Sequence, residues 1–251
     1  MNRNAPRGAA VYGVDLGKNV FHVVGLDADG AVIQRVKFRR DTLLAFFEQA
    51  SKAIVGMEAC SGSQWLAREL EAMGHRVRII PAQFVKPYVK SQKNDTIDAE
   101  AIAEAATRPT KRFTRVRTTQ EVDLQALHRI RDQLISSRTR LINQVRGFCL
   151  EYGVAIHQGA GVFRRDLPRV LGDEENDLTP TMRRMLTELY EDIERLDRRI
   201  AAATREIEAL AARDDRARRL MTIPGIGPLG ATALLAAVAA HSSDRGSSGV
   251  P

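Results

Sequence analysis

Short apolar runs alternate with amphipathic segments over the first hundred residues of the chain. Five of these runs are rich in β-branched residues, which predicts strands at Val11–Val14, Phe21–Leu26, Ala31–Phe38, Ala53–Met57 and Val77–Ile80. Two segments between them have helical periodicity: Thr42–Ala50, with Asp41 as its cap, and Ser61–Met73, closed by Gly74. Strands joined by helices in this way predict an α/β layer with a mixed sheet.

Beyond Pro81 the pattern becomes almost wholly helical. A capping box, Thr118-x-x-Glu121, opens a long helix whose apolar stripe is Leu127, Ile130, Leu134, Leu141, Val145 and Phe148. We expect Gly153–Thr181 to be a loop-rich linker. From Met182 to Leu210 apolar residues recur at spacings of four and three, which is typical of a coiled coil. The same seam also suits an intramolecular bundle, in which the 111–150 helix folds back over it.

Composition excludes several classes of protein. The chain has 251 residues, 44% of them hydrophobic, which is enough to bury a core. No run approaches the roughly 20 apolar residues of a membrane span, and the N-terminus lacks the apolar region of a signal peptide. Cys60 and Cys149 fit neither a disulfide framework nor a zinc site. We therefore expect a cytoplasmic protein that meets no membrane.

The net charge of +7 is concentrated in one stretch of the chain. Residues 111–150 hold nine basic and three acidic side chains, so they carry +6 of the excess. A local cluster indicates a polyanionic partner, because arginine favours bidentate contacts with phosphate. A solvated helix face is the simpler alternative. From this stretch we expect the following residues to bind nucleic acid: Arg112, Arg115, Arg117, Arg129, Arg138 and Arg140.

Four acidic residues stand where a metal site could form. Asp15 ends the first predicted strand and Glu58 ends the fourth, and side chains at such strand ends project into the ligand crevice of an α/β sheet. Asp95 and Asp98 are three residues apart at the start of a helix, which places both on one face. Each acid alone could be a turn or cap residue. Together they predict a site for two Mg²⁺ (or Mn²⁺) ions that cleaves phosphodiester bonds.

The order and setting of these acids resemble a known family. Gly13-Val-Asp-Leu-Gly-Lys, then Gly56-Met-Glu-Ala-Cys-Ser-Gly, then Lys93-Asn-Asp-Thr-Ile-Asp-Ala are similar to the motifs of the DEDD transposases of the IS one-ten family of insertion sequences. Trp65 matches too, as does Pro81 followed by Lys86, Lys90 and Lys93. Thr222-Ile-Pro-Gly-Ile-Gly-Pro is similar to the start of that family's C-terminal domain. The resemblance covers about residues 11–240.

The resemblance implies a division into three parts. Residues 11–108 would form a RuvC-like, RNase-H-like nuclease domain, with Asp15, Glu58, Asp95 and Asp98 as catalytic and metal-binding residues. Residues 109–216 would form an Arg-rich helix, a linker and a coiled coil, and residues 217–251 a truncated C-terminal transposase domain. It also implies a transposase or recombinase that catalyses DNA transposition, a form of DNA recombination, guided by a structured RNA. We expect a homo-oligomer that forms through the 182–210 helix.

Two further features are expected to contact nucleic acid. Ile223-Pro-Gly-Ile-Gly-Pro reads as the turn of a helix-hairpin-helix element, in which Gly225 and Gly227 allow close approach of a phosphate. A tight connector between two helices is the alternative. Lys86, Lys90 and Lys93 provide a second set of cations beside the acidic motif.

The last residues depart from the family pattern. The family's C-terminal domain contributes a serine nucleophile, but the segment after Ala240 has no periodicity, and Ser247-Ser248-Gly249 matches only superficially. A C-terminal truncation is therefore expected. It leaves two alternatives open: a non-catalytic remnant that binds nucleic acid, and a RuvC-like junction resolvase. The first motif also resembles the phosphate loop of actin-like ATPases, but the other motifs that such a fold needs are missing from the sequence.

Overall fold

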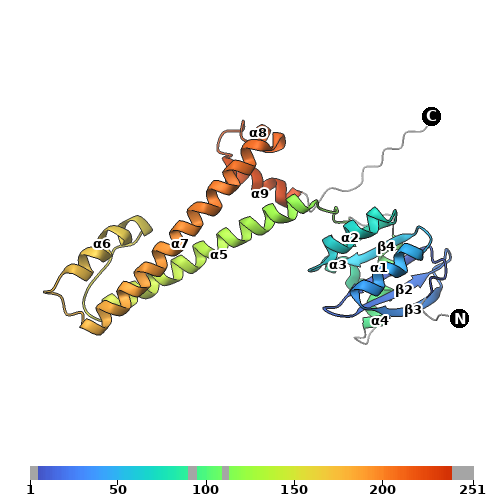
Figure 1. Cartoon of the computed structure of the whole chain (residues 1–251), viewed down its shortest axis with the longest axis horizontal. Coiled ribbons are helices and arrows are strands. Elements are labelled where there is room, and N and C mark those ends of the chain that lie inside the picture. The colour runs from blue at the N-terminus through green and yellow to red at the C-terminus, as the bar shows by residue number, and fades with distance from the viewer. Residues whose placement is uncertain (1–4, 90–94, 109–112, 239–251) are drawn as a thin grey trace. The chain divides into compact units, whose positions relative to one another are not determined.

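The computed structural model describes residues 5–89, 95–108 and 113–238 (Figure 1). Contacts divide the chain into two compact units, a sheet unit within residues 1–121 and a helical unit of residues 122–236. The predicted tail after Ala240 lies outside the described residues. Within the described part, no helix is both long and apolar enough to span a membrane.

The sheet unit contains five strands in the spatial order β3-β2-β1-β4-β5. β1 is antiparallel to β2, and β2 to β3, whereas β4 runs parallel to both β1 and β5. This mixed sheet confirms the predicted α/β layer, and its order and directions are consistent with an RNase-H-like domain. The strands are β1 Val11–Leu16, β2 Phe21–Leu26, β3 Val32–Phe38, β4 Ile54–Glu58 and β5 Arg76–Ile80.

Helices cover both faces of the sheet because neighbouring strand residues point to opposite sides. On one face Tyr12 and Met57 pack with residues of α1 (Arg40–Gln49) and α2 (Ser63–Ala72). On the other face the packing partners are α4 (Asp95–Thr107), α3 (Ala82–Val85) and the short helix η1 (Lys86–Tyr88).

The cap predicted for the first helix is wrong. Arg39 is the N-cap residue of α1, and its backbone N–H donates to the hydroxyl of Thr42, 3.0 Å away. Asp41 lies inside the first turn of the helix instead. A carboxylate in the first turn still interacts favourably with the helix dipole, which is why the sequence pattern alone did not separate the two positions.

The remaining helices lie mainly in the helical unit. The predicted capping box opens α5: the Glu121 N–H donates to the Thr118 hydroxyl (3.2 Å), and the Thr118 N–H donates to the Glu121 carboxylate (3.1 Å). The helices are α5 Thr119–Leu150, α6 Ala160–Gly172, α7 Pro180–Arg213, α8 Asp215–Leu220 and α9 Pro228–Val238.

The prediction of a loop-rich linker is wrong for residues 160–172, which form α6. Two glycines and an internal proline, Pro168, hid this helix from a reading of composition. Phe163 and Leu167 lie four residues apart and are both fully buried, so the helix is held by its packing rather than by its propensity.

The apolar seam of α7 packs against helices of the same chain. Leu186 and Ile193 belong to one buried cluster with Ile142 of α5 and Phe163 of α6, and α5 and α7 lie side by side (Figure 1). Leu134 and Val145 of the predicted α5 stripe are buried, as is Ile142, whereas Ile130 is 49% exposed. The structure therefore shows the fold-back arrangement, and the predicted contact of this seam with a second copy would compete with it.

Charged groups fix the register of the two long helices. Asp197 of α7 accepts hydrogen bonds from Arg138 of α5 (2.9 Å) and from Arg164 of α6 (2.6 Å). About two turns farther along α5 and α7, Arg131 donates to the hydroxyl of Thr204 (2.9 Å). Burial raises the pKa of Asp197, but the two guanidinium groups outweigh it and leave that pKa below its usual value.

We predict that Asp197→Asn lowers the free energy of unfolding of the helical unit by about 1–3 kcal/mol at neutral pH, because two charge-assisted hydrogen bonds are weakened. A carboxylate whose pKa is lower in the folded protein than in the unfolded chain stabilises the fold. This stabilisation is fully present above the unfolded pKa, about 3.9, and is lost as the pH falls through the folded pKa. The cost of the substitution should therefore shrink below about pH 4. Urea denaturation followed by circular dichroism, at neutral pH and below about pH 4, measures the free energy of unfolding of both proteins.

Glu188→Gln is the matched control, since Glu188 pairs with Arg184 at an exposed position where ion pairs contribute little. An equal effect of the two substitutions would contradict a structural role for Asp197.

Candidate active site

Two of the predicted acids lie at the carboxyl ends of neighbouring parallel strands. Asp15 is near the end of β1 and Glu58 is the last residue of β4. The pairing of the two strands runs through Val14 opposite Met57, so Asp15 and Glu58 occupy the next positions. Each lies two residues beyond a glycine that faces α4, and the alternation of side chains therefore turns both acids toward the α4 face.

The electrostatic environment of Cys60 is consistent with this placement of the two acids. Partial burial raises the pKa of the Cys60 thiol, and the negative charges of Glu58 and Asp15 raise it further. Cys60 follows β4 by two residues and is exposed. The negative charges of both carboxylates therefore act on this one thiol.

A row of polar side chains continues from Asp15 across the sheet. Asp15 is paired with His22 of β2, and His22 is paired with Lys37 of β3. Directly paired residues of antiparallel strands lie on the same face. His22 and Lys37 were not predicted as part of the site, because the strand register that aligns them with Asp15 is a long-range property.

Two glycines allow α4 to lie directly on the sheet. A Cβ atom on Gly13 of β1 would be 2.1 Å from the carbonyl oxygen of Ala99, and a Cβ on Gly56 of β4 would be 2.5 Å from the Cβ of Ala106. Real Cβ atoms do not approach other atoms so closely, so only glycine permits this packing. The two glycines are those of the sequence motifs, two residues before Asp15 and Glu58.

The contact of α4 with Gly13 also fixes the position of the other two predicted acids. Asp98 is half-buried and directly precedes Ala99, which touches Gly13. Asp95 is the first residue of α4, and its side chain lies outside the described residues. Among the side chains that the structure describes, no three His, Cys, Asp or Glu residues are close enough to hold a metal ion. Convergence of all four acids therefore stays a prediction.

A family model for DEDD transposases of the IS110 type, described as Transposase, matches residues 12–153. The match covers more than half of the chain, including both strand-end acids and α4. The chain belongs to this family.

Curated members of this transposase family are similar over most of the chain. The transposase for insertion sequence element IS1328 of Yersinia enterocolitica is 42% identical over 224 residues, 89% of this chain and 66% of that protein. A probable family 20 transposase of Pseudomonas aeruginosa is 41% identical over 225 residues (89% and 67%). The transposase for IS1111A of Coxiella burnetii is 40% identical over 236 residues (94% and 65%). The chain thus spans about two thirds of the length of these transposases.

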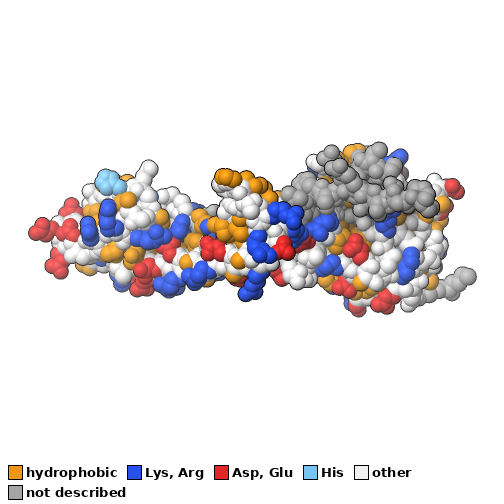
Figure 2. All heavy atoms as spheres, turned by 90° about the horizontal axis from the view of Figure 1, so that it is seen from above, with side chains coloured by type: hydrophobic (Ala, Val, Ile, Leu, Met, Phe, Trp, Pro, Cys, Tyr) orange, Lys and Arg blue, Asp and Glu red, His pale blue; other side chains and the backbone are white. Residues whose placement is uncertain are grey.

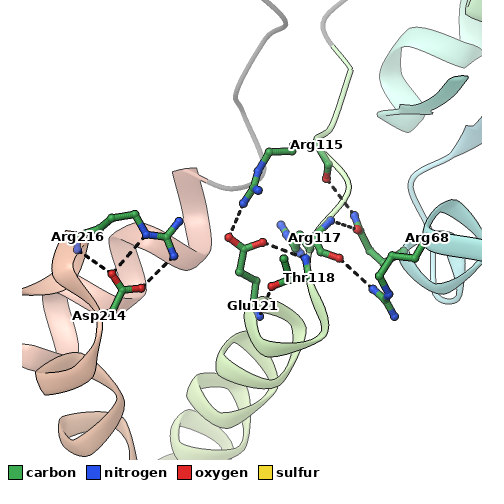
Figure 3. Close-up of polar contacts among 8 residues, drawn as sticks. Arg68, Arg115, Arg117, Thr118, Glu121, Asp214 and Arg216 are labelled. Carbon is green, nitrogen blue, oxygen red and sulfur yellow. Dashed lines mark hydrogen bonds and ion pairs between the residues drawn. The ribbon is translucent and has the colours of Figure 1, made fainter. Parts of the chain in front are cut away.

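Several arginines predicted to bind nucleic acid have partners within the chain. Arg115 forms an ion pair with Glu121, and the backbone of Arg117 is held by Gln64 and Arg68 of α2 (Figure 3). Arg138 is bound to Asp197. The partners of Arg117 and Arg138 are distant in the sequence, so a charge count of the segment does not reveal them.

Other predicted cations remain on the surface. Arg129 and Arg140 of α5 are exposed, although Arg140 donates to the hydroxyl of Ser137 (3.1 Å), and Lys86 of η1 is exposed. On the face drawn in Figure 2, basic and acidic side chains are interspersed along the helical unit. Lys90, Lys93 and Arg112 lie outside the described residues.

The Pro-Gly turn joins α8 to α9 as a tight connector. Gly225 has a φ of +87°, and the Ile226 N–H donates to the Ile223 carbonyl (3.1 Å), the pattern of a type II turn with Pro224 and Gly225 at its centre. Gly225 and Gly227 are exposed. Contact of these glycines with a phosphate stays a prediction.

We predict that Gly13→Ala destabilises the sheet unit by about 1–3 kcal/mol or more, because the new Cβ meets the backbone of α4 rather than a flexible side chain. Urea unfolding followed by fluorescence measures it, since Trp65 is the only tryptophan of the chain and packs against the core of this unit.

Gly147→Ala in α5 serves as the control. A Cβ there would meet nothing within 4 Å, so the substitution should be neutral or stabilise by about 0.5–1 kcal/mol. If Gly13→Ala is as stable as the wild type, the packing of α4 does not require this close approach.

Proposed function

We propose that the sheet unit is the RuvC-like nuclease unit of an insertion-sequence transposase, and that it cleaves and joins DNA strands through Asp15, Glu58, Asp95 and Asp98. The observation that supports this most is the placement of Asp15 and Glu58 on adjacent parallel strands, with both charges acting on Cys60. Family membership and the order of the sheet strands support the same chemistry.

The donor chemistry of the edge suits Mg²⁺ or Mn²⁺. Carboxylate oxygens are the ligands that these hard cations prefer. Burial is the main reason why the pKa of Cys60 is raised, and the negative charges of Glu58 and Asp15, which a cation would neutralise, raise it further. Asp15 and Glu58 would hold the ions together with Asp98 and Asp95. When bound, such ions activate the nucleophile and stabilise the leaving oxygen in phosphodiester cleavage.

The contribution of the protein is a rigid frame. Val14 and Met57, which precede the two acids, are fully buried, so the backbone that carries Asp15 and Glu58 is fixed by the core. The glycine contacts fix α4, and with it Asp98, against the same strands. Functional groups carried by packed strands and helices are positioned more precisely than groups on loops.

The proposed substrate is the DNA of an insertion sequence, as the names of the relatives indicate, with a structured guide RNA as an additional partner. Exposed Arg129, Arg140 and Lys86 would contribute phosphate contacts. The α8–α9 connector would act as a helix-hairpin-helix element, with Gly225 and Gly227 at the phosphate. Assembly of copies would use a surface other than the buried α7 seam.

We predict that Asp15→Asn, Glu58→Gln and Asp98→Asn each reduce divalent-metal-dependent cleavage of DNA that carries an element end by about 100-fold or more, which corresponds to the several kcal/mol that metal-ion stabilisation supplies. A gel assay of strand cleavage with Mg²⁺ or Mn²⁺, and with a chelator, measures it. DNA affinity should be unchanged in each variant.

Asp29→Asn, at an exposed position in the turn between β2 and β3, is the control and should cleave like the wild type. A wild-type chain that binds DNA but never cleaves it would overturn the proposed chemistry in favour of a non-catalytic binding protein.

A further inference from the structure

Two adjoining cavities lie at the end of β3, the start of α1 and the β1–β2 turn, and the function proposed above uses neither. The larger has a volume of about 590 Å³ and a partly apolar lining that includes Val20, Phe38 and Phe46. The smaller, of about 510 Å³, lies over the β1–β2 turn and the start of α1. Val20 and Arg39 line both cavities, so the two form one continuous surface.

This surface is strongly cationic. Lys18, Lys37, Arg39 and Arg40 line it, against a single acid, Asp41. All four cations are exposed, and no ion pair of Lys18, Lys37 or Arg39 occurs within the described residues. Unlike Arg115 and Arg138, these groups are available to an anion from outside the chain. Clustered cations without internal partners indicate a polyanionic ligand.

The cationic surface is fixed in place rather than carried on a long loop. The Gly17 N–H donates to the Val20 carbonyl (3.1 Å) and closes the β1–β2 turn that presents Lys18. The guanidinium of Arg40 lies over the Trp65 ring, 4.7 Å from its centroid, and 5.8 Å from that of Phe21. These cation–π contacts hold Arg40 in the lining of the smaller cavity.

Two cations of this surface, Lys18 and Lys37, are linked to Asp15 by sequence and strand register, whereas its apolar lining at Phe38 and Phe46 is on the α1 side of the sheet. Lys18 follows Asp15 by three residues. Lys37 is in the cross-strand row that runs from Asp15 through His22, two strands away, which corresponds to about 10 Å at the usual strand spacing. A strand of nucleic acid with its scissile phosphate at Asp15 would therefore meet these cations with its neighbouring phosphates.

We infer that this surface holds the DNA strand that is being cut, with backbone phosphates on Lys18, Lys37 and Arg39 and an unstacked base against the apolar lining at Val20. Val20 is 39% exposed between the cations, and apolar surface beside a cationic track is how proteins hold single strands without reading their sequence. The inference rests on the proposed nuclease function. It names DNA rather than RNA because Lys18 and Lys37 lie on the turn and in the cross-strand row next to Asp15, an acid proposed to cut DNA.

The test compares two triple variants of the full chain that remove the same charge. Lys18→Gln, Lys37→Gln and Arg39→Gln are combined in one protein, and Arg198→Gln, Arg199→Gln and Arg205→Gln, all exposed on α7, in the control. Fluorescence anisotropy measures the affinity for a single-stranded DNA at several salt concentrations. Loss of three phosphate contacts should reduce the slope of log affinity against log salt by about 2, because each contact contributes about 0.7.

The control triple should keep the wild-type slope, and equal slopes for the two triples would overturn the inference. If the Lys18, Lys37 and Arg39 triple variant loses affinity for an RNA of the same sequence but not for the DNA, the inference is overturned as well. The fluorescence of Trp65 gives a second, local readout. DNA binding should change its emission in the wild type and in Asp15→Asn, and should change it much less in the variant that combines Lys18→Gln, Lys37→Gln and Arg39→Gln. If the wild type does not cleave DNA but the salt slopes of the two triple variants still differ, the nuclease chemistry is refuted and the binding surface is supported.

Discussion

The close contact between α4 and the central strands is the constraint on which the sheet unit depends. At Gly13 and Gly56 the helix backbone lies where a Cβ atom would otherwise be. This contact determines how far α4 stands from β1 and β4, and therefore where Asp98 lies relative to Asp15 and Glu58. The motif glycines and the motif acids therefore act together. Each glycine allows α4 to contact the sheet, and each acid follows two residues later on the same face.

The helical unit depends on a different balance. Its long helices are joined by an apolar seam and by the carboxylate of Asp197, which satisfies one guanidinium from α5 and one from α6. Partly buried arginines without such a partner would be costly. The excess of arginine in residues 111–150 is therefore partly structural, and a count of charges along the chain does not measure the surface that remains for nucleic acid.

Local features of both units could be predicted from the sequence. The strands, the Thr118–Glu121 capping box and the positions of Asp15 and Glu58 depend on short-range periodicity and hydrogen bonding, and they were predicted correctly. Features that need long-range contacts were missed. α6 depends on burial of Phe163 and Leu167 against α5 and α7, the partner of the α7 seam depends on the fold-back, and the alignment of His22 and Lys37 with Asp15 depends on strand register.

The most direct test of the account is a crystal structure of the full chain soaked with Mn²⁺, with the metal located by its anomalous scattering. The account predicts a Mn²⁺ ion bound by carboxylate oxygens of Asp15 and Glu58, with Asp98 or Asp95 of α4 as a further ligand. Mn²⁺ bound elsewhere on the sheet unit, or bound at Asp15 without any acid of α4, would contradict the claim that the glycine-seated helix completes the site.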